Sequence, residues 1–247
     1  MADHTGLQER IDAHPYWFHR IDLGAGVVTP GWDDPGRWKL EQFGVPADMT
    51  GKRVLDIGCA EGFFSFEAER RGASEVVAID EDQGDNGTLE RFRLCADALG
   101  SKVTIRRASV SDLDPETFGT FDIVLFFGVL YHLTDMVTAV ESIASVTRGR
   151  LLLQSHAFES SSVGDVPVAR FHAHGITSGT KANPLPDRTV RWVPNAACVR
   201  DLLIHAGFDD VVQIRSSARR SRRQAVSDAL HPRRERRVSA VFHATHR

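Results

Sequence analysis

The strongest constraint on the fold is a regular alternation of apolar runs and amphipathic segments between residues 52 and 155. Each apolar run is six or seven residues long, a length typical of a buried strand. The amphipathic segments between them predict helices, two of which end at Gly72 and Gly100. Strands that alternate with helices predict βαβ units, and therefore a doubly wound, Rossmann-like α/β fold with a mostly parallel sheet. The predicted strands are 52–58, 74–80, 102–107, 121–127 and 150–155, and the predicted helices are 63–72, 88–100 and 135–146.

On both sides of this region the sequence has a different character. Residues 1–50 hold three of the four tryptophans, separated by glycine and proline, and predict an N-terminal cover segment. Residues 51–247 are expected to form the main domain. Within it, residues 156–194 are rich in Gly, Pro and Ser and predict an irregular insertion. A helix over 194–208 and strands over 211–214 and 238–244 are expected to complete the domain.

Composition excludes several classes of protein. With 42% hydrophobic and 26% charged residues in a chain of 247, the protein has the balance of an ordinary globular domain. No apolar stretch approaches the ~20 residues of a membrane span, and the polar N-terminus does not resemble a secretory signal. The three cysteines lie far apart without a metal-binding spacing, so we expect neither a zinc site nor a disulfide framework. These features predict a cytoplasmic protein with no membrane partner.

The segment DIGCAEG, residues 56–62, predicts a tight turn of small residues after the first strand. Such a turn lets backbone amides and a helix N-terminus approach a nucleotide-like ligand. The dinucleotide fingerprint G-x-G-x-x-G is absent, because Ala60 and Phe63 occupy two of its glycine positions. A carboxylate at Asp56 suits a ligand with an ammonium group, and Asp80, 24 residues later, suits the two hydroxyls of a ribose.

This combination indicates S-adenosylmethionine as the cofactor. The alternative is an α/β domain that binds no nucleotide, in which Asp80 only caps a helix. The cofactor-binding residues predicted from these two motifs are Asp56, Gly58, Cys59, Ala60, Gly62 and Asp80.

DIGCAEG followed by VVAID resembles the class I S-adenosylmethionine-dependent methyltransferases. The stretches FFGVLYHLTD, TVRWVPNAACVRDLLIHAGF and RWKL more narrowly resemble the tRNA wobble-uridine carboxymethyltransferase family and its small methyltransferase relatives. The resemblance implies a seven-stranded sheet with an antiparallel last strand. It also implies cofactor contacts from Trp38, Phe127 and Tyr131, and adenine-side contacts from Ser109 and Val110.

The chain departs from the carboxymethyltransferase pattern in ways that concern the cofactor. Those enzymes hold a carboxylated cofactor through a lysine, a tyrosine and an arginine. Tyr131 matches the tyrosine, and Arg236 or Arg237 could serve as the arginine. The lysine position falls near His19 and Arg20, so only the charge of Arg20 could replace it, and the RNA-modifying members have a longer N-terminal region. These departures favour plain methyl transfer to an oxygen or nitrogen of a small molecule.

Transfer to a hydroxyl benefits from a general base, and histidine is the usual one at neutral pH. His132 follows Tyr131 beyond the fourth predicted strand, where doubly wound folds bind ligands. His19 is a second candidate and His156 a third, and each alternatively has a purely structural role. The predicted catalytic residues are therefore His132, His19 and Tyr131, and the predicted substrate-binding residues are Tyr16, Trp17, Arg20, His156, His172 and Trp192. Trp192 is alternatively a hydrophobic staple of the following helix.

Two further features bear on metals and RNA. His172 and His174 lie two residues apart without an accompanying acidic cluster, so we predict no metal site. The stretch 215–247 carries ten arginines against two acidic residues, a basic excess that suits phosphates. Because stacking aromatics are absent from its arginine-rich part, 215–237, RNA is the less favoured partner. The alternatives to a small-molecule methyltransferase are thus a tRNA wobble-uridine methyl- or carboxymethyltransferase and a non-catalytic cofactor-binding module.

Overall fold

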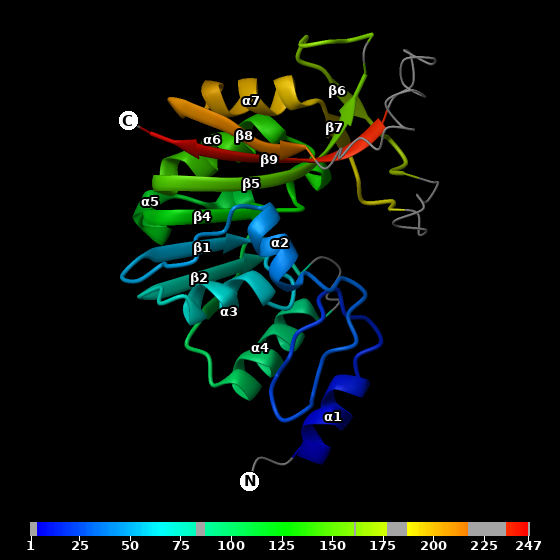
Figure 1. Cartoon of the computed structure of the whole chain (residues 1–247), viewed down its shortest axis with the longest axis vertical. Helices are drawn as coiled ribbons and strands as arrows, with labels where there is room; N and C mark the ends of the chain where they lie inside the picture. The colour runs from blue at the N-terminus through cyan, green and yellow to red at the C-terminus, as the bar shows by residue number, and fades with distance from the viewer. Residues whose placement is uncertain (1–3, 83–86, 161, 177–186, 217–235, 247) are drawn as a thin grey trace. The chain divides into compact units, whose positions relative to one another are not determined.

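The computed structural model describes residues 4–82, 87–160, 162–176, 187–216 and 236–246. Its main sheet has seven strands in the order β3-β2-β1-β4-β5-β9-β8, with β9 antiparallel to both of its neighbours (Figure 1). The predicted seven-stranded α/β fold with an antiparallel last strand is therefore confirmed. The chain divides into two compact units, residues 1–125 and residues 126–247, which are described in turn.

The first unit holds the parallel strands β1, β2 and β3 and the helices around them. Val54 on β1 is in register with Val76 on β2, and Val77 on β2 with Thr104 on β3. The elements are α1 (His4–Asp12), α2 (Gly36–Gln42), β1 (Arg53–Ile57), α3 (Phe63–Arg70), β2 (Glu75–Asp80), α4 (Thr88–Leu99), β3 (Thr104–Arg107), the 3-10 helix η2 (Val110–Asp112), α5 (Pro115–Phe118) and β4 (Phe121–Phe127), whose last two residues fall in the second unit.

The N-terminal segment shares the hydrophobic core of this unit. Ile11, Trp17 and Ile21 are buried in one cluster with Phe92 and Cys95 of α4. In Figure 1 the blue N-terminal chain runs alongside α4, in agreement with these contacts. The N-terminal segment thus packs as part of the first unit. The predicted boundary at residue 50 rests on composition alone and stays a prediction.

The second unit contains the antiparallel part of the sheet and a small separate hairpin. Its elements are the 3-10 helix η3 (Leu130–His132), α6 (Met136–Val146), β5 (Thr147–Glu159), β6 (Ala169–Phe171), β7 (Trp192–Pro194), α7 (Ala196–His205), β8 (Asp210–Ser216) and β9 (Arg236–Thr245). Most of these elements match the predicted ones within a few residues.

Two differences concern the segment predicted to be irregular. β5 continues to Glu159 rather than ending near Ser155, because residues 156–159 pair with residues 236–239 of β9. β6 and β7 pair as antiparallel strands, with Arg170 opposite Val193. None of the helices in the described part of the chain has the length and apolar character needed to cross a membrane.

Candidate active site

The turn after β1 is built so that small residues alternate with buried side chains. Gly58, Ala60 and Gly62 all have positive φ angles, of 70°, 48° and 94°. The side chains between them, Cys59 and Glu61, are only 3% and 1% exposed. This turn leaves nothing larger than a methyl group at alternate positions, which allows a ligand to approach the backbone closely.

Gly62 also has a packing role. A Cβ atom there would lie 2.5 Å from the ring of Phe92 and 2.8 Å from the ring of Phe66. Its left-handed conformation immediately precedes α3, so any larger residue would be strained in two ways. The glycine is therefore required by the core as well as by the turn.

Asp80 closes β2 beside this turn. Its Oδ2 accepts a hydrogen bond from the Ala60 amide at 3.1 Å, and its Oδ1 accepts one from the Asp82 amide at 2.9 Å. Burial raises the pKa of Asp80, although the two amide hydrogen bonds oppose that shift. A carboxylate has about four lone-pair sites, so this one keeps acceptor capacity for hydroxyl groups.

Asp56 is buried at the end of β1, where its Oδ2 accepts a hydrogen bond from the Ser65 hydroxyl at 2.5 Å. Burial raises the pKa of Asp56 to about 7, with a contribution from the neighbouring Asp80 carboxylate and opposition from Ser65. The predicted pairing of Asp56 with a ligand ammonium group stays a prediction. Within the structure its partner is Ser65 of α3.

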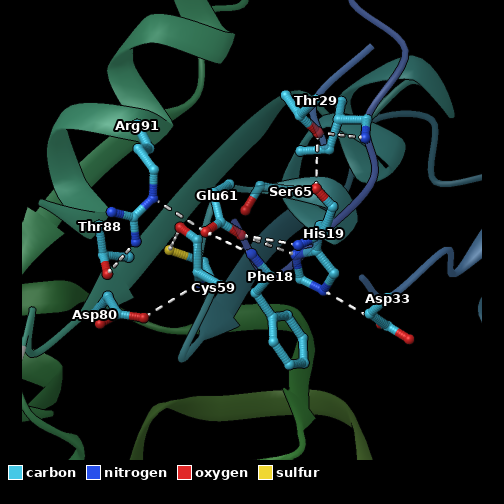
Figure 2. A network of polar contacts seen from close by, with 12 residues as sticks. Phe18, His19, Thr29, Asp33, Cys59, Glu61, Ser65, Asp80, Thr88 and Arg91 are labelled. Carbon is cyan, nitrogen blue, oxygen red and sulfur yellow. Dashed lines mark hydrogen bonds and ion pairs between the residues drawn. The ribbon is translucent and has the colours of Figure 1, made fainter. Parts of the chain in front are cut away.

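Glu61 connects the turn to the N-terminal segment and to α4 (Figure 2). Its carboxylate accepts hydrogen bonds from the backbone amides of Phe18 and His19, both at 3.1 Å. It also pairs with the guanidinium of Arg91 at 3.2 Å, and Arg91 is 2% exposed. Because both members of this ion pair are buried and further hydrogen-bonded, they hold the N-terminal segment against the turn.

His19 lies within this network. Its Nδ1 is 3.7 Å from Glu61 and has no hydrogen-bond partner within the described residues, and its Nε2 is 3.9 Å from Asp33. Burial and the charge of Lys39 lower the pKa of His19 to about 3. A buried imidazole that is so weakly basic is suited to positioning the segment, and the geometry does not favour the predicted role as a general base.

A second group of polar side chains lies in the second unit around η3. The ring of Tyr131 is 4.2 Å from those of both His132 and His156, measured between centroids. Nδ1 of His132 is 2.9 Å from the hydroxyl of Thr189, which donates to Oδ1 of Asp187 at 2.6 Å. Burial lowers the pKa of His132 below 6.5, an effect that the charge of Asp187 and a hydrogen bond with the Thr189 backbone oppose and the charge of Arg191 reinforces.

The sequence of residues 54–149 matches a family model described as "Methyltransferase domain". The chain is 31% identical over 197 residues to a ubiquinone biosynthesis O-methyltransferase from Xanthomonas euvesicatoria, an alignment that covers 72% of this chain and 80% of that protein. The chain belongs to the S-adenosylmethionine-dependent methyltransferases. It is also 25% identical over 162 residues to a tRNA U34 carboxymethyltransferase from Helicobacter pylori, over 63% of this chain and 59% of that protein.

Solved structures agree in fold. The N-terminal domain of EvdMO1, solved in the presence of SAH and D-fucose, matches with a TM-score of 0.69 and 21% identity, over 100% of this chain and 98% of that one. The [4+2]-cyclase SpnF matches with a TM-score of 0.56 and 17% identity, over 98% and 92% of the two chains. At these identities the likeness concerns the fold alone.

The methyltransferase uses S-adenosylmethionine, and the residues after β1 and β2 fit this cofactor. The alternating small residues of the turn leave room for a ligand at the backbone, and the acceptor capacity of Asp80 suits the predicted contact with the ribose. Ser109 and Val110 follow β3, next to the hydrogen bond from the Ala108 amide to the Asp80 carbonyl. They remain predicted adenine contacts, with Ser109 capping η2 and Val110 buried.

Two other residues predicted to contact the cofactor, Trp38 and Phe127, are not fully buried. Trp38 lies on α2 with 57% of its surface exposed, and its indole donates to the Asp34 carbonyl. Phe127 ends β4 and is half-buried.

Cys59 is buried, and burial together with the Asp56 and Asp80 carboxylates raises the pKa of its thiol well above the usual range. The Cys59 side chain is therefore not a reactive thiolate, and its contact with the cofactor stays a prediction.

The residues predicted to bind substrate fall in both units. In the first, Trp17 is buried in the core, Tyr16 is 51% exposed and accepts a hydrogen bond from Trp32, and Arg20 is exposed. In the second, the indole of Trp192 donates a hydrogen bond to the Thr134 carbonyl. Its ring packs against the ring of Phe171, with 4.9 Å between the ring centroids.

The histidines of the second unit differ in exposure. His156 is half-buried beside Tyr131, and burial with the neighbouring His132 lowers its pKa to about 4. His172 is half-buried and His174 exposed. In the part of the chain that the structure describes, no three His, Cys, Asp or Glu side chains converge on a common point.

Sequence reasoning missed four polar residues of these sites: Glu61, Arg91, Thr189 and Asp187. Glu61 lies inside the quoted motif DIGCAEG, and its charge in a turn of small residues was a usable signal. For Arg91 and Thr189 the decisive contacts join residues 30 or more positions apart, which no local pattern indicates, and Asp187 is linked to His132 through Thr189.

Proposed function

We propose that this methyltransferase transfers a methyl group to a hydroxyl oxygen of a small-molecule acceptor, with His132 as the general base. The observation that carries the proposal is the ring of His132, hydrogen-bonded at Nδ1 and of lowered pKa. An imidazole that is neutral at pH 7 and held at one nitrogen can accept a proton at the other. The O-methyltransferase relative, aligned over 80% of its length, supports transfer to oxygen.

His132 is the best placed of the three candidate histidines. His19 is 4% exposed and weakly basic, and the pKa of His156 is lowered to about 4. His132 is half-buried, and the contact to the Thr189 hydroxyl engages Nδ1 of its ring. In the proposed reaction the acceptor hydroxyl therefore meets the other ring nitrogen, Nε2.

In this proposal the residues of the protein bind the cofactor and move a proton, and none of them forms a covalent bond with the acceptor. When bound, S-adenosylmethionine supplies an electrophilic methyl group whose S–CH3 bond breaks as the new O–CH3 bond forms. His132 takes the proton from the acceptor hydroxyl on Nε2 and passes it to solvent afterwards. Asp80 and the turn 58–62 bind and orient the cofactor, since correct placement of the reacting atoms supplies much of the rate.

The test is transfer of labelled methyl from S-adenosylmethionine to a panel of phenols, catechols and hydroxylated sugars, with wild type, His132→Gln and His205→Gln. His205 is an exposed histidine paired with Glu141 and serves as the matched control. Loss of a general base should lower kcat by about 10²- to 10⁴-fold in His132→Gln alone. Equal activity of all three proteins on a methylated acceptor would remove His132 from the reaction.

A second candidate function is modification of a tRNA wobble uridine, with ordinary or carboxylated cofactor. The tRNA U34 carboxymethyltransferase relative favours it, and so does Arg237 at the start of β9. Burial is the main cause of the lowered pKa values of His156 and His172, and the charge of Arg237 adds to it in both. The remainder of the arginine-rich stretch, residues 217–235, lies outside the described residues.

Competition between the two cofactors decides this alternative. Preference for the carboxylated form, lost in Arg237→Ala, would support the tRNA function, because an arginine pairs well with a carboxylate. A third candidate, the non-catalytic cofactor-binding module, requires that no acceptor turn over although the cofactor binds. We further propose a cytoplasmic location, which is consistent with three free thiols.

A further inference from the structure

Thr189 joins two side chains that are distant in the sequence. Its Oγ1 lies 2.9 Å from Nδ1 of His132, 57 residues away, and 2.6 Å from Oδ1 of Asp187. The same Oδ1 accepts a hydrogen bond from the Thr189 amide at 3.0 Å. A single hydroxyl therefore stands between a carboxylate and an imidazole.

The direction of these hydrogen bonds follows from the chemistry of the groups. A carboxylate only accepts hydrogen bonds, and a hydroxyl has one proton to donate. The bond to the ionised partner is the stronger of the two, so the Thr189 proton points to Asp187. The Thr189 oxygen is then an acceptor toward His132, whose Nδ1 must carry a proton.

We propose that Asp187 and Thr189 are positioning residues that hold neutral His132 as the Nδ1–H tautomer, with the lone pair of Nε2 directed to the acceptor. The hydrogen bond at one imidazole nitrogen sets which nitrogen is protonated. The catalytic part of this inference rests on the proposed function of His132 as the base. The assignment of the tautomer does not rest on that proposed function.

The backbone keeps this arrangement in place on both sides. The Ile176 amide donates to the Asp187 carbonyl at 2.7 Å, and the Arg191 amide donates to the Tyr131 carbonyl at 2.8 Å. The second bond ties the segment that carries Thr189 directly to η3, which carries His132. The contact between the two side chains thus does not depend on one flexible rotamer.

An Asp and a Thr two residues apart also form common local turn contacts without any catalytic role. Those contacts would leave the His132 tautomer unaffected by Thr189. The two explanations therefore make different predictions for the imidazole nitrogens.

The first measurement is nitrogen NMR of protein labelled in its histidines, at a pH where His132 is neutral. Wild type should show His132 with a protonated Nδ1 and an unprotonated Nε2. Thr189→Val, which cannot accept at this position, should lose that preference, and Thr189→Ser should keep it. Thr138→Val is the matched control, because Thr138 donates to Asp135 in the same unit. A wild-type His132 protonated at Nε2 would overturn the proposal.

The second measurement is kinetic. Thr189→Val and Asp187→Ala should lower kcat on the order of 10- to 100-fold while KM for S-adenosylmethionine stays constant, and Thr189→Ser should recover most of the rate. Unchanged kcat in Thr189→Val, with His132→Gln inactive, would contradict the positioning role alone. If the tautomer is as predicted but His132→Gln is fully active, the proposed function fails and the assignment of the tautomer stands.

Discussion

Asp56 is a carboxyl group that folding makes harder to ionise. Its pKa is raised from 3.8 to about 7, so the folded state binds a proton more tightly than the unfolded state does. The stability this provides is fully present below pH 3.8 and is lost as the pH rises through about 7. We expect Asp56→Asn to remove this part of the pH dependence, on the order of a few kcal/mol.

The measurement for Asp56 is the free energy of unfolding from denaturant titrations at pH 4 and pH 8. Wild type should lose more stability than Asp56→Asn between these two values, whereas the exposed control Asp97→Asn should follow wild type. Parallel pH dependence in all three proteins would show that Asp56 ionises normally.

The predicted placement of the ribose depends on Asp80. Removing a carboxylate that hydrogen-bonds a ligand costs about 1.5–3 kcal/mol, or roughly 10- to 100-fold in affinity. Asp80→Ala should weaken binding of S-adenosylhomocysteine by this factor in calorimetry, and Asp80→Asn by less, because the amide keeps one acceptor oxygen. The ribose assignment is wrong if Asp80→Ala binds as tightly as wild type and Asp97→Ala do.

If His132 is the base, as proposed, it determines the acidic side of the pH–rate profile. The base must be neutral, and burial lowers its pKa below 6.5; Asp187 and the Thr189 backbone oppose this shift, and the nearby Arg191 adds to it. The rate should therefore fall only as the pH drops through a value below 6.5. We expect this limb in the profile of kcat/KM for wild type and His205→Gln, and expect it to be absent from the residual activity of His132→Gln. An acidic midpoint above 6.5 would argue against His132.

At the scale of elements, the N-terminal segment is attached to Glu61 of the turn after β1 by two amide hydrogen bonds, and Glu61 itself forms a buried ion pair with Arg91 of α4. Breaking such a pair from one side costs about 3–5 kcal/mol, because the remaining charge stays buried. Arg91→Met should therefore destabilise the protein by about that amount and expose residues 16–19 to hydrogen exchange. Arg93→Met, on the exposed face of the same helix, is the control. If the hydrogen-exchange protection of residues 16–19 were unchanged in Arg91→Met, the amide hydrogen bonds of this segment to Glu61 would not depend on Arg91.

The elements of the core could be predicted because their signals are local. The strand FDIVLFF and the helix ending at Gly100 are found where the sequence indicates them. The β6–β7 pair could not be predicted, because its strands have three residues each and lie twenty residues apart. The same holds for the contact of Glu61 with the Phe18 amide, which joins residues 43 positions apart. The glycine turn and Asp80 were found, whereas Thr189 became visible only through its contact with His132.

At the scale of the whole molecule, the family and the cofactor do not by themselves identify the acceptor substrate. The chain aligns with two kinds of relative, one named for ubiquinone biosynthesis and one for tRNA. A tRNA partner would bind through phosphates and lose affinity steeply as salt is added. A small acceptor would show little dependence on salt, so ionic strength separates the two classes before any product is identified.

The most direct test supplies purified protein with S-adenosylmethionine, a small-molecule acceptor panel and bulk tRNA in one reaction, followed by mass spectrometry of both fractions. We predict a methylated hydroxyl compound that forms with wild type and His205→Gln, and that is reduced at least about 100-fold with His132→Gln. A methylated uridine in the tRNA fraction, with no product among the small molecules, would contradict the account.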